Sequence, residues 1–285
     1  METKVYRRET FDQERALYGA KNVLLDGCAF EGEADGESAL KESEKVWARG
    51  TRFALRYPLW HAKEANLSSI TMTETCRAPL WYAKGVHIKD GELFAPKAVR
   101  ECEDVTLLNC EIISEEFGWF SSGIGIVNSS VTGAYAFLRS RDITAREMRF
   151  EGKYSFQYVE NARFVNCHFK TKDAFWHTKN VTVENSVIEG EYLGWYSEGL
   201  HLVRCHIKGT QPLCYAKDLV LEDCTMEGCD LAFEKSTVTA TVEGHIDSIK
   251  APAGGEITAD SVGEILPQND GEKGKAVIRV TYHAE

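Results

Sequence analysis

The 285-residue sequence has no apolar run near the roughly 20 residues that a membrane-spanning helix needs. Its first residues, Met-Glu-Thr-Lys-Val-Tyr-Arg-Arg-Glu, also lack the apolar stretch of a secretory signal. We therefore expect a cytoplasmic protein with no membrane partner. The composition, 43% hydrophobic and 27% charged, is ordinary for a globular chain and argues against disorder and against a coiled coil.

The sequence has fewer basic than acidic residues. The chain has 33 Lys and Arg residues against 44 Asp and Glu residues, so its formal net charge is -11. The resulting field repels phosphate backbones, and no basic run longer than Arg7-Arg8 offsets it locally. We therefore expect no nucleic-acid partner.

Several motifs that would carry chemistry are missing. Nine cysteines are present without any Cys-x-x-Cys pair, so we expect reduced, buried cysteines in place of a disulfide framework or a structural zinc site. A phosphate-cradling glycine-rich loop, a nucleophile elbow and a metalloprotease motif are absent too. The sequence therefore predicts no cofactor and no bound metal, and gives no support to NTP hydrolysis or serine hydrolase chemistry.

What the sequence does contain is an internal repeat. The segment Asp-Val-Thr-Leu-Leu-Asn-Cys-Glu-Ile at 104–112 has copies of its pattern at 161–169, 180–188, 199–207 and 218–226. Successive units start 19 positions apart from Gly85 to Asp218, and less regular units start at Asn22, Lys45 and Glu64. A fixed period of this length indicates a repeat architecture.

Each unit alternates apolar with variable or polar residues. Its second and fourth positions are apolar, as in Val105 and Leu107 or Val181 and Val183, which is typical of a strand with one buried face. Corners rich in Asn, Asp and Gly separate these short strands. The pattern predicts an all-β, single-stranded, right-handed parallel β-helix of about 12 coils of ~19 residues, in which each strand pairs with its copy one coil away. A leucine-rich repeat does not fit, because its consensus pattern and helical half are missing.

We expect a single β-helix domain over residues 1–285. Residues 1–14 are polar and are expected to form an N-terminal cap, 15–236 form the regular coils, and 237–285 form irregular last coils and a C-terminal cap.

The repeat units resemble a known family, together with the recurring segment of the type Leu-Trp-Tyr-Ala-Lys at 80–84. This is an uncharacterised bacterial family, a domain of unknown function with right-handed parallel β-helix repeats. The resemblance covers about Phe11 to about Ile265. It implies a pectin-lyase-like architecture, but no established activity and no catalytic residues.

The most unusual feature is the last segment of each unit, where five of the six tryptophans fall in one column. This column also contains Lys41, Arg100 and Gln157, which could not be stacked unpaired in a dry core. We therefore expect the column and its neighbour to form an exposed or partly exposed aromatic stripe. The ligand-binding candidates are Trp60, His61, Trp81, Tyr82, Trp119, Tyr158, Trp176, His177, Trp195, Tyr196 and Tyr215.

Three interpretations of this stripe stay open. It is a carbohydrate-binding face, a homo-oligomer or protein interface, or a purely structural ladder of stacked rings. We favour a carbohydrate-binding or polysaccharide-related module, with a non-catalytic interaction scaffold as the alternative.

The sequence leaves open whether the protein is an enzyme. Glycoside hydrolysis needs two carboxyl groups about 5–9.5 Å apart, and no repeated acidic column supplies them. The best catalytic candidates are Asp173, His177 and Glu191, close to Trp176 and Trp195, although a solvated, charge-rich corner explains the two carboxylates equally well. If a reaction exists, a polysaccharide lyase or glycoside hydrolase is expected.

Overall fold

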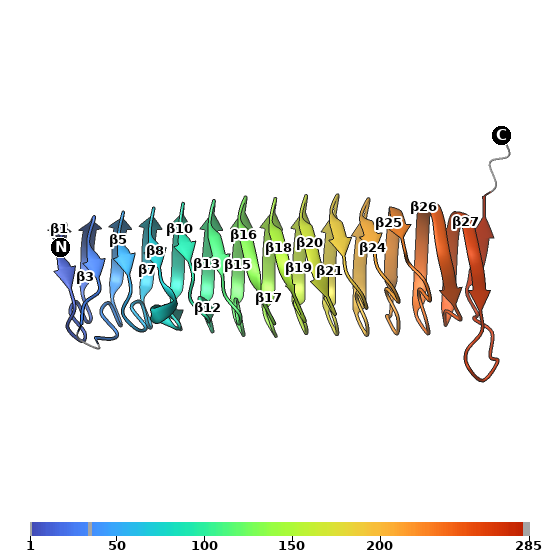
Figure 1. The fold of residues 1–285 in the computed structure, drawn as a ribbon, viewed down its shortest axis with the longest axis horizontal. Coiled ribbons are helices and arrows are strands. Elements are labelled where there is room, and N and C mark those ends of the chain that lie inside the picture. Colours follow the sequence, from blue (N-terminus) through green and yellow to red (C-terminus); the bar gives the residue numbers. More distant parts are fainter. Residues whose placement is uncertain (1, 34–35, 282–285) are drawn as a thin grey trace. The chain divides into compact units, whose positions relative to one another are not determined.

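The computed structural model describes residues 2–33 and 36–281 and divides into two compact units, Met1–Thr144 and Ala145–Glu285. In each unit the chain winds as a parallel β-solenoid, whose strands lie side by side as successive rungs (Figure 1). The strand β17 (Arg141–Arg146) spans the division between the two units.

The first unit repeats a six-residue strand followed by a shorter one. The principal strands are β1 (Lys4–Arg7), β3 (Lys21–Asp26), β5 (Glu44–Arg49), β7 (Lys63–Ser68), β10 (Lys84–Lys89), β13 (Glu103–Leu108) and β15 (Ser122–Val127). The shorter strands are β2 (Thr10–Phe11), β4 (Ala29–Phe30), β6 (Arg52–Phe53), β8 (Thr71–Met72), β11 (Glu92–Leu93), β14 (Glu111–Ile113) and β16 (Ser130–Ala134). A small separate sheet joins β9 (Leu80–Trp81) to β12 (Val99–Arg100), and a 3-10 helix, η1, covers Glu74–Cys76.

The second unit continues the pattern and ends in longer strands. Its principal strands are β19 (Glu160–Val165), β21 (Lys179–Glu184), β23 (Glu198–Val203), β25 (Leu219–Glu227), β26 (Thr237–Lys250), β27 (Gly254–Leu266) and β28 (Val277–Val280). The shorter strands are β18 (Arg149–Lys153), β20 (His168–Lys172), β22 (Val187–Glu189) and β24 (His206–Lys208).

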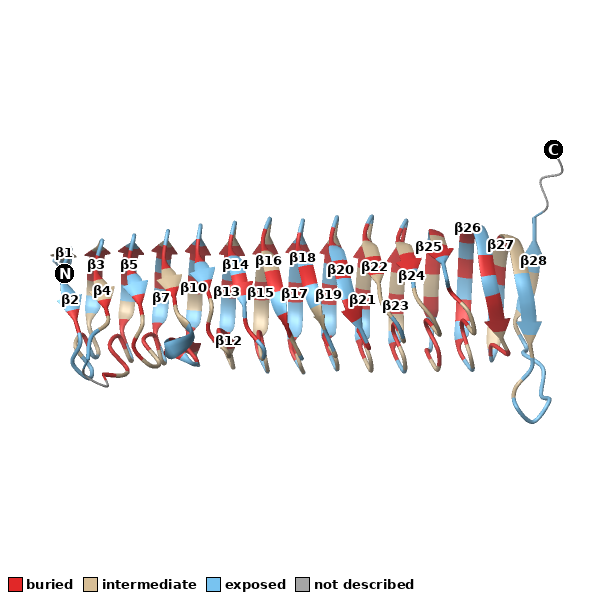
Figure 2. Cartoon of the chain, viewed as in Figure 1, coloured by how far each residue is buried: buried red, intermediate tan, exposed pale blue. Residues whose placement is uncertain are grey.

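The register between rungs follows the sequence repeat. Val86 pairs with Val105 and Ile88 with Leu107, so residues 19 positions apart face each other across parallel strands. Both pairs are buried, whereas His87 between them is exposed. The period-2 alternation read from the sequence therefore separates an inward from an outward face on each rung (Figure 2).

Stacked aromatic rings fill part of each core. In the first unit Phe11, Phe30 and Phe53 stack with centroids 5.0 and 5.2 Å apart. In the second unit Phe156 and Phe175 stack at 4.7 Å. Like residues recur in one column because the register repeats, so the rings of neighbouring rungs meet at stacking distance.

The predicted all-β parallel solenoid is confirmed. The described strands form about 14 rungs of roughly this period, which is slightly more than expected. The additional rungs arise because β1 in the expected N-terminal cap pairs with β3, and because β26, β27 and β28 in the expected C-terminal cap pair in parallel. Residues 282–285 of that cap lie outside the described residues. The single-domain organisation, the right-handed winding and the pectin-lyase-like assignment stay predictions.

Two further observations concern the chain as described. All nine cysteines are buried, and each is a free thiol. Within residues 2–33 and 36–281, no helix has the length and apolar character needed to cross a membrane.

Candidate functional site

A row of outward side chains crosses five neighbouring strands of the first unit. On β5, Val46 and Ala48 point into the core and are buried, so the residue between them, Trp47, points outward. The register then places Leu24, Trp47, Asn66, His87 and Thr106 opposite one another on β3, β5, β7, β10 and β13. The row is therefore a direct product of the repeat.

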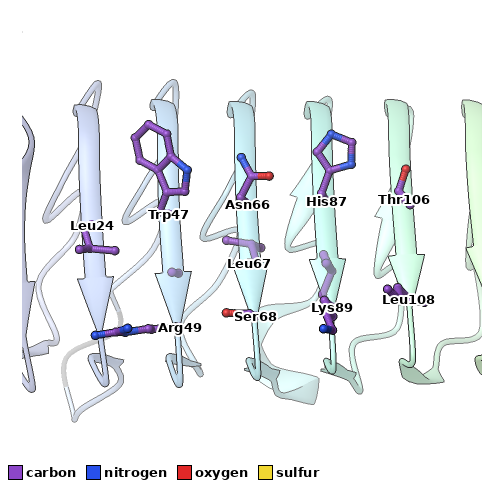
Figure 3. Close-up of a pocket in the computed structure, with 12 residues that line it drawn as sticks. Leu24, Trp47, Arg49, Asn66, Leu67, Ser68, His87, Lys89, Thr106 and Leu108 are labelled. Carbon is purple, nitrogen blue, oxygen red and sulfur yellow. The ribbon is translucent and has the colours of Figure 1, made fainter.

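This row and its neighbours line a groove of about 430 Å³, which we call the Trp47 groove (Figure 3). The volume lies in the range of small-molecule sites. The lining residues are Leu24, Trp47, Ala48, Arg49, Asn66, Leu67, Ser68, His87, Ile88, Lys89, Thr106 and Leu108.

Two flat rings lie along the groove. Trp47 is 39% exposed, and its neighbours in the row, Leu24 and Asn66, are not aromatic, so no ring stacks on it from an adjacent rung. Figure 3 shows the rings of Trp47 and His87 nearly face-on in a view onto the strands. They are two rungs apart, about 9.6 Å at the usual strand spacing. The groove therefore presents ring faces outward.

Arg49 bonds Asp26, but three other polar side chains of the groove are not engaged by the protein. Across the described part of the chain, the side chains of Asn66, His87 and Lys89 form no hydrogen bond or ion pair. In the second unit, by contrast, the outward His201 of β23 bonds Glu222 at 3.0 Å. The position that corresponds to Glu222 is Leu108 in the first unit, so His87 keeps both ring nitrogens available.

The sequence analysis missed this groove. It assigned the positions between the apolar columns to variable surface residues, and Trp47 is the one tryptophan that stands outside the aromatic column. That isolated tryptophan in an outward strand position was the available signal.

The five tryptophans of the predicted stripe are half-buried, and three of them are anchored to the backbone. The indole nitrogens of Trp119, Trp176 and Trp195 each donate to a carbonyl 16 residues ahead, at 2.6, 2.6 and 2.7 Å. Trp81 donates to the Glu101 carboxylate at 3.3 Å. The buried indole nitrogen of Trp60 has no partner within the described residues, and the Lys41 ammonium lies 4.1 Å from its ring centroid.

The column one position after the tryptophan column forms ring-on-ring stacks. In the second unit, Tyr158, His177, Tyr196 and Tyr215 lie in one column with successive centroids 4.8, 4.9 and 4.9 Å apart and planes within 13°. In the first unit, His61 and Tyr82 stack in the same way at 4.9 Å. Tyr196 is 46% exposed, but its faces are turned to its neighbours and its edge to solvent. This geometry favours the structural-ladder interpretation of the stripe, and its ligand-binding role stays a prediction.

Two of the three catalytic candidates, Asp173 and Glu191, lie on neighbouring coils and are joined through the backbone. The backbone N–H of Asp173 donates to the Glu191 carbonyl at 2.9 Å, and the Glu191 carboxylate pairs with Lys172 at 3.3 Å. Burial raises the pKa of Asp173, which is 5% exposed, and burial lowers the pKa of His177. The imidazole lies in the ring stack between Tyr158 and Tyr196. Their catalytic role stays a prediction.

Metal ligands do not cluster in the described residues, where no group of three His, Cys, Asp or Glu side chains could hold an ion. The absence of a bound metal stays a prediction.

Comparison with known proteins gives a family and several distant structures. The family model described as Protein of unknown function (DUF3737) matches residues 4–279. Curated proteins give no match. Among solved structures, a double mutant of the periplasmic alginate epimerase AlgG is 10% identical, with a TM-score of 0.36 over 93% of this chain and 78% of that chain.

Two further solved structures are similar at the same distant level. HetL, a pentapeptide repeat protein involved in heterocyst differentiation regulation from the cyanobacterium Nostoc sp. strain PCC 7120, is 9% identical, with a TM-score of 0.25 over 78% of this chain and 92% of that chain. QnrB1, a plasmid-mediated fluoroquinolone resistance protein, is 14% identical, with a TM-score of 0.18 over 75% and 84%. No functional assignment rests on these three likenesses.

Proposed function

The chain belongs to the family described as Protein of unknown function (DUF3737), and we propose from its own geometry that it binds a saccharide in the Trp47 groove. The observation that carries the proposal is the exposed ring face of Trp47, with the second ring, His87, two rungs away (Figure 3).

The chemistry of the lining fits a sugar. Saccharide rings have apolar C–H faces that pack on aromatic planes, and hydroxyl edges that need hydrogen-bond partners. The groove supplies Trp47 and His87 for the faces, and the side chains of Asn66, Ser68 and Thr106 for the hydroxyls. A mostly apolar concave surface with a few convergent polar groups is the usual form of a small-molecule site.

The aromatic stripe fits the same ligand less well. Its rings cover one another at 4.8–4.9 Å, so a sugar meets ring edges along most of the column. We therefore place the saccharide on the groove. The stripe as a second site or as a contact between copies, the cytoplasmic location and any catalysis remain predictions.

The first prediction tests the groove directly. Trp47→Ala removes the larger ring and is expected to lower saccharide affinity at least tenfold. An aromatic side chain that the ligand covers on binding contributes more than about 1.4 kcal/mol to the binding free energy. Wild type and variant are compared by retention on an array of neutral and acidic glycans, followed by calorimetric titration of the best glycan.

The control is Tyr196→Ala, which removes a somewhat more exposed ring from the stripe of the second unit. Retention by Tyr196→Ala with loss in Trp47→Ala supports the groove. The reverse result places the ligand on the stripe and contradicts the proposal, as does a wild-type protein that binds no glycan.

A further inference from the structure

A second outward row runs beside the ring row of the Trp47 groove, and it is basic. The register places Asp26, Arg49, Ser68, Lys89 and Leu108 opposite one another on the same five strands. Each lies two residues after a member of the ring row, and therefore on the same face of its strand. Arg49 and Lys89 accordingly flank the groove on the strands that carry Trp47 and His87.

Cations outnumber carboxylates at the Arg49 end of this row. Arg49 holds Asp26 through Nε and Nη2 at 2.7 and 2.8 Å, and Arg7 lies 3.9 Å from the same carboxylate. The hydrogen bond from Arg49 is the main cause that lowers the pKa of Asp26, and the charges of Arg49, Arg7 and Arg8 add to it. Two guanidinium groups, those of Arg49 and Arg7, thus pair with one carboxylate, which leaves a surplus of positive charge.

The Lys89 end has an ammonium group that no carboxylate neutralises. Lys89 forms no ion pair within the described residues, and the side chain of the following Asp90 accepts a hydrogen bond from the Asn109 amide at 3.0 Å. None of the twelve residues that line the groove is acidic. The groove lining is therefore positively charged, although the chain as a whole has a net charge of -11.

Ring and cation recur together at a fixed spacing. Trp47 is followed two residues later by Arg49 on β5, and His87 by Lys89 on β10, with the small polar Asn66 and Ser68 on β7 between them. Both the rings and the cations are therefore two rungs apart, about 9.6 Å. A ligand that crosses the strands meets a ring and a positive charge at each of two positions.

We propose, resting on the saccharide function above, that the ligand is an anionic saccharide. Its sugar rings pack on Trp47 and His87 while its carboxylate or sulfate groups lie over Arg49 and Lys89. The chain of the saccharide runs across the rungs, because both rows do.

The ligand side of the test compares three matched probes. These are a uronic-acid oligosaccharide, the same oligosaccharide after reduction of its carboxyl groups, and a sulfated oligosaccharide of similar length. We expect the uronic or the sulfated probe to bind at least fivefold more tightly than the reduced one, with an advantage that shrinks as salt is raised from 50 to 500 mM, since exposed charges are screened. The probe that binds more tightly distinguishes carboxylate from sulfate.

The protein side uses Lys89→Gln, which removes the charge but keeps most of the stem. Because Lys89 makes no ion pair, this variant is expected to unfold at the wild-type temperature. It should bind the anionic probe about fivefold more weakly and leave the affinity for the reduced probe unchanged. Lys217→Gln, an exposed lysine of the second unit, is the control with the same change of net charge.

The outcomes separate the two proposals. Equal binding of the anionic and reduced probes, with Trp47→Ala still harmful, overturns the anionic saccharide and keeps the groove as a neutral-sugar site. An equal effect of Lys89→Gln and Lys217→Gln overturns it too, because the charge then acts at long range. Failure of every probe to bind overturns the saccharide function itself.

Discussion

At the residue scale, Asp173 in the second unit is a buried carboxyl whose pKa is raised, with burial as the first cause. The folded chain therefore holds this proton more tightly than the unfolded chain does. Stability is lost as the pH rises from the ordinary value of 3.8 through the raised value, because the ionised carboxylate must stay buried.

This predicts that Asp173→Asn stabilises the protein at neutral pH. Asparagine has the same size and tolerates the positive φ of 54° at this position. We expect a gain of about 1 kcal/mol at pH 7, shrinking toward zero near pH 3, where the carboxyl of the wild type is protonated. Denaturant titrations at the two pH values measure it. Destabilisation at pH 7 would show that the ionised carboxylate is a favoured partner of a neighbouring group.

The same scale shows where sequence-based prediction ends. Val105 and Leu107 identify the buried face by alternation alone, and the register confirms them. Trp47 and His87 lie on the face that alternation marks only as outward. Whether these two side chains are available to a ligand depends on the residues of the adjacent rungs; the rung next to His87, for example, has Leu108 where the rung next to His201 has a carboxylate. Such neighbours are known only from the three-dimensional register.

At the scale of the strand and its corner, the tryptophans connect neighbouring coils through hydrogen bonds and ring stacking. Trp176 donates its indole N–H to the Tyr192 carbonyl at 2.6 Å and stacks on Trp195 with centroids 5.3 Å apart. The sequence analysis predicted a partly exposed column, and the half-buried indoles agree with it. It could not predict the backbone acceptors, since these depend on how the corner of the next coil bends.

Trp176→Phe keeps a ring and removes the donor. We expect it to lower the free energy of unfolding by about 1 kcal/mol, the usual net contribution of one hydrogen bond. Chemical denaturation measures the change. Trp47→Phe is the matched control, because the Trp47 indole nitrogen forms no hydrogen bond within the described residues, and it should leave stability unchanged. Equal losses in the two variants would contradict the linking role.

At the scale of the whole molecule, each rung depends chiefly on its two neighbours, as in other solenoids. The pairs Val181 with Leu200 and Ile188 with Ile207 repeat the same register on consecutive rungs of the second unit. If one coil of 19 residues is removed, the coils on either side of it are therefore expected to pair with each other in the same register.

Deletion of residues 180–198 tests this. It joins Lys179 to Gly199, which stands at the repeat position of Asn180, and it offers Trp176 the Gln211 carbonyl in place of that of Tyr192. We expect a single cooperative thermal transition, a β-type circular dichroism spectrum and unchanged saccharide binding in the Trp47 groove of the first unit. Deletion of residues 180–189, about half a coil, is the control and should abolish the cooperative transition.

The parallel register also limits how such a surface changes its ligand. The separation between Trp47 and His87 is fixed by backbone pairing, so substitutions alter it only in increments of one strand spacing, about 4.8 Å. Selectivity for polymers of different repeat length then evolves when a side chain moves to another rung of the row or when a coil is duplicated. The distance between the two rings cannot increase gradually, because the strand spacing is constant.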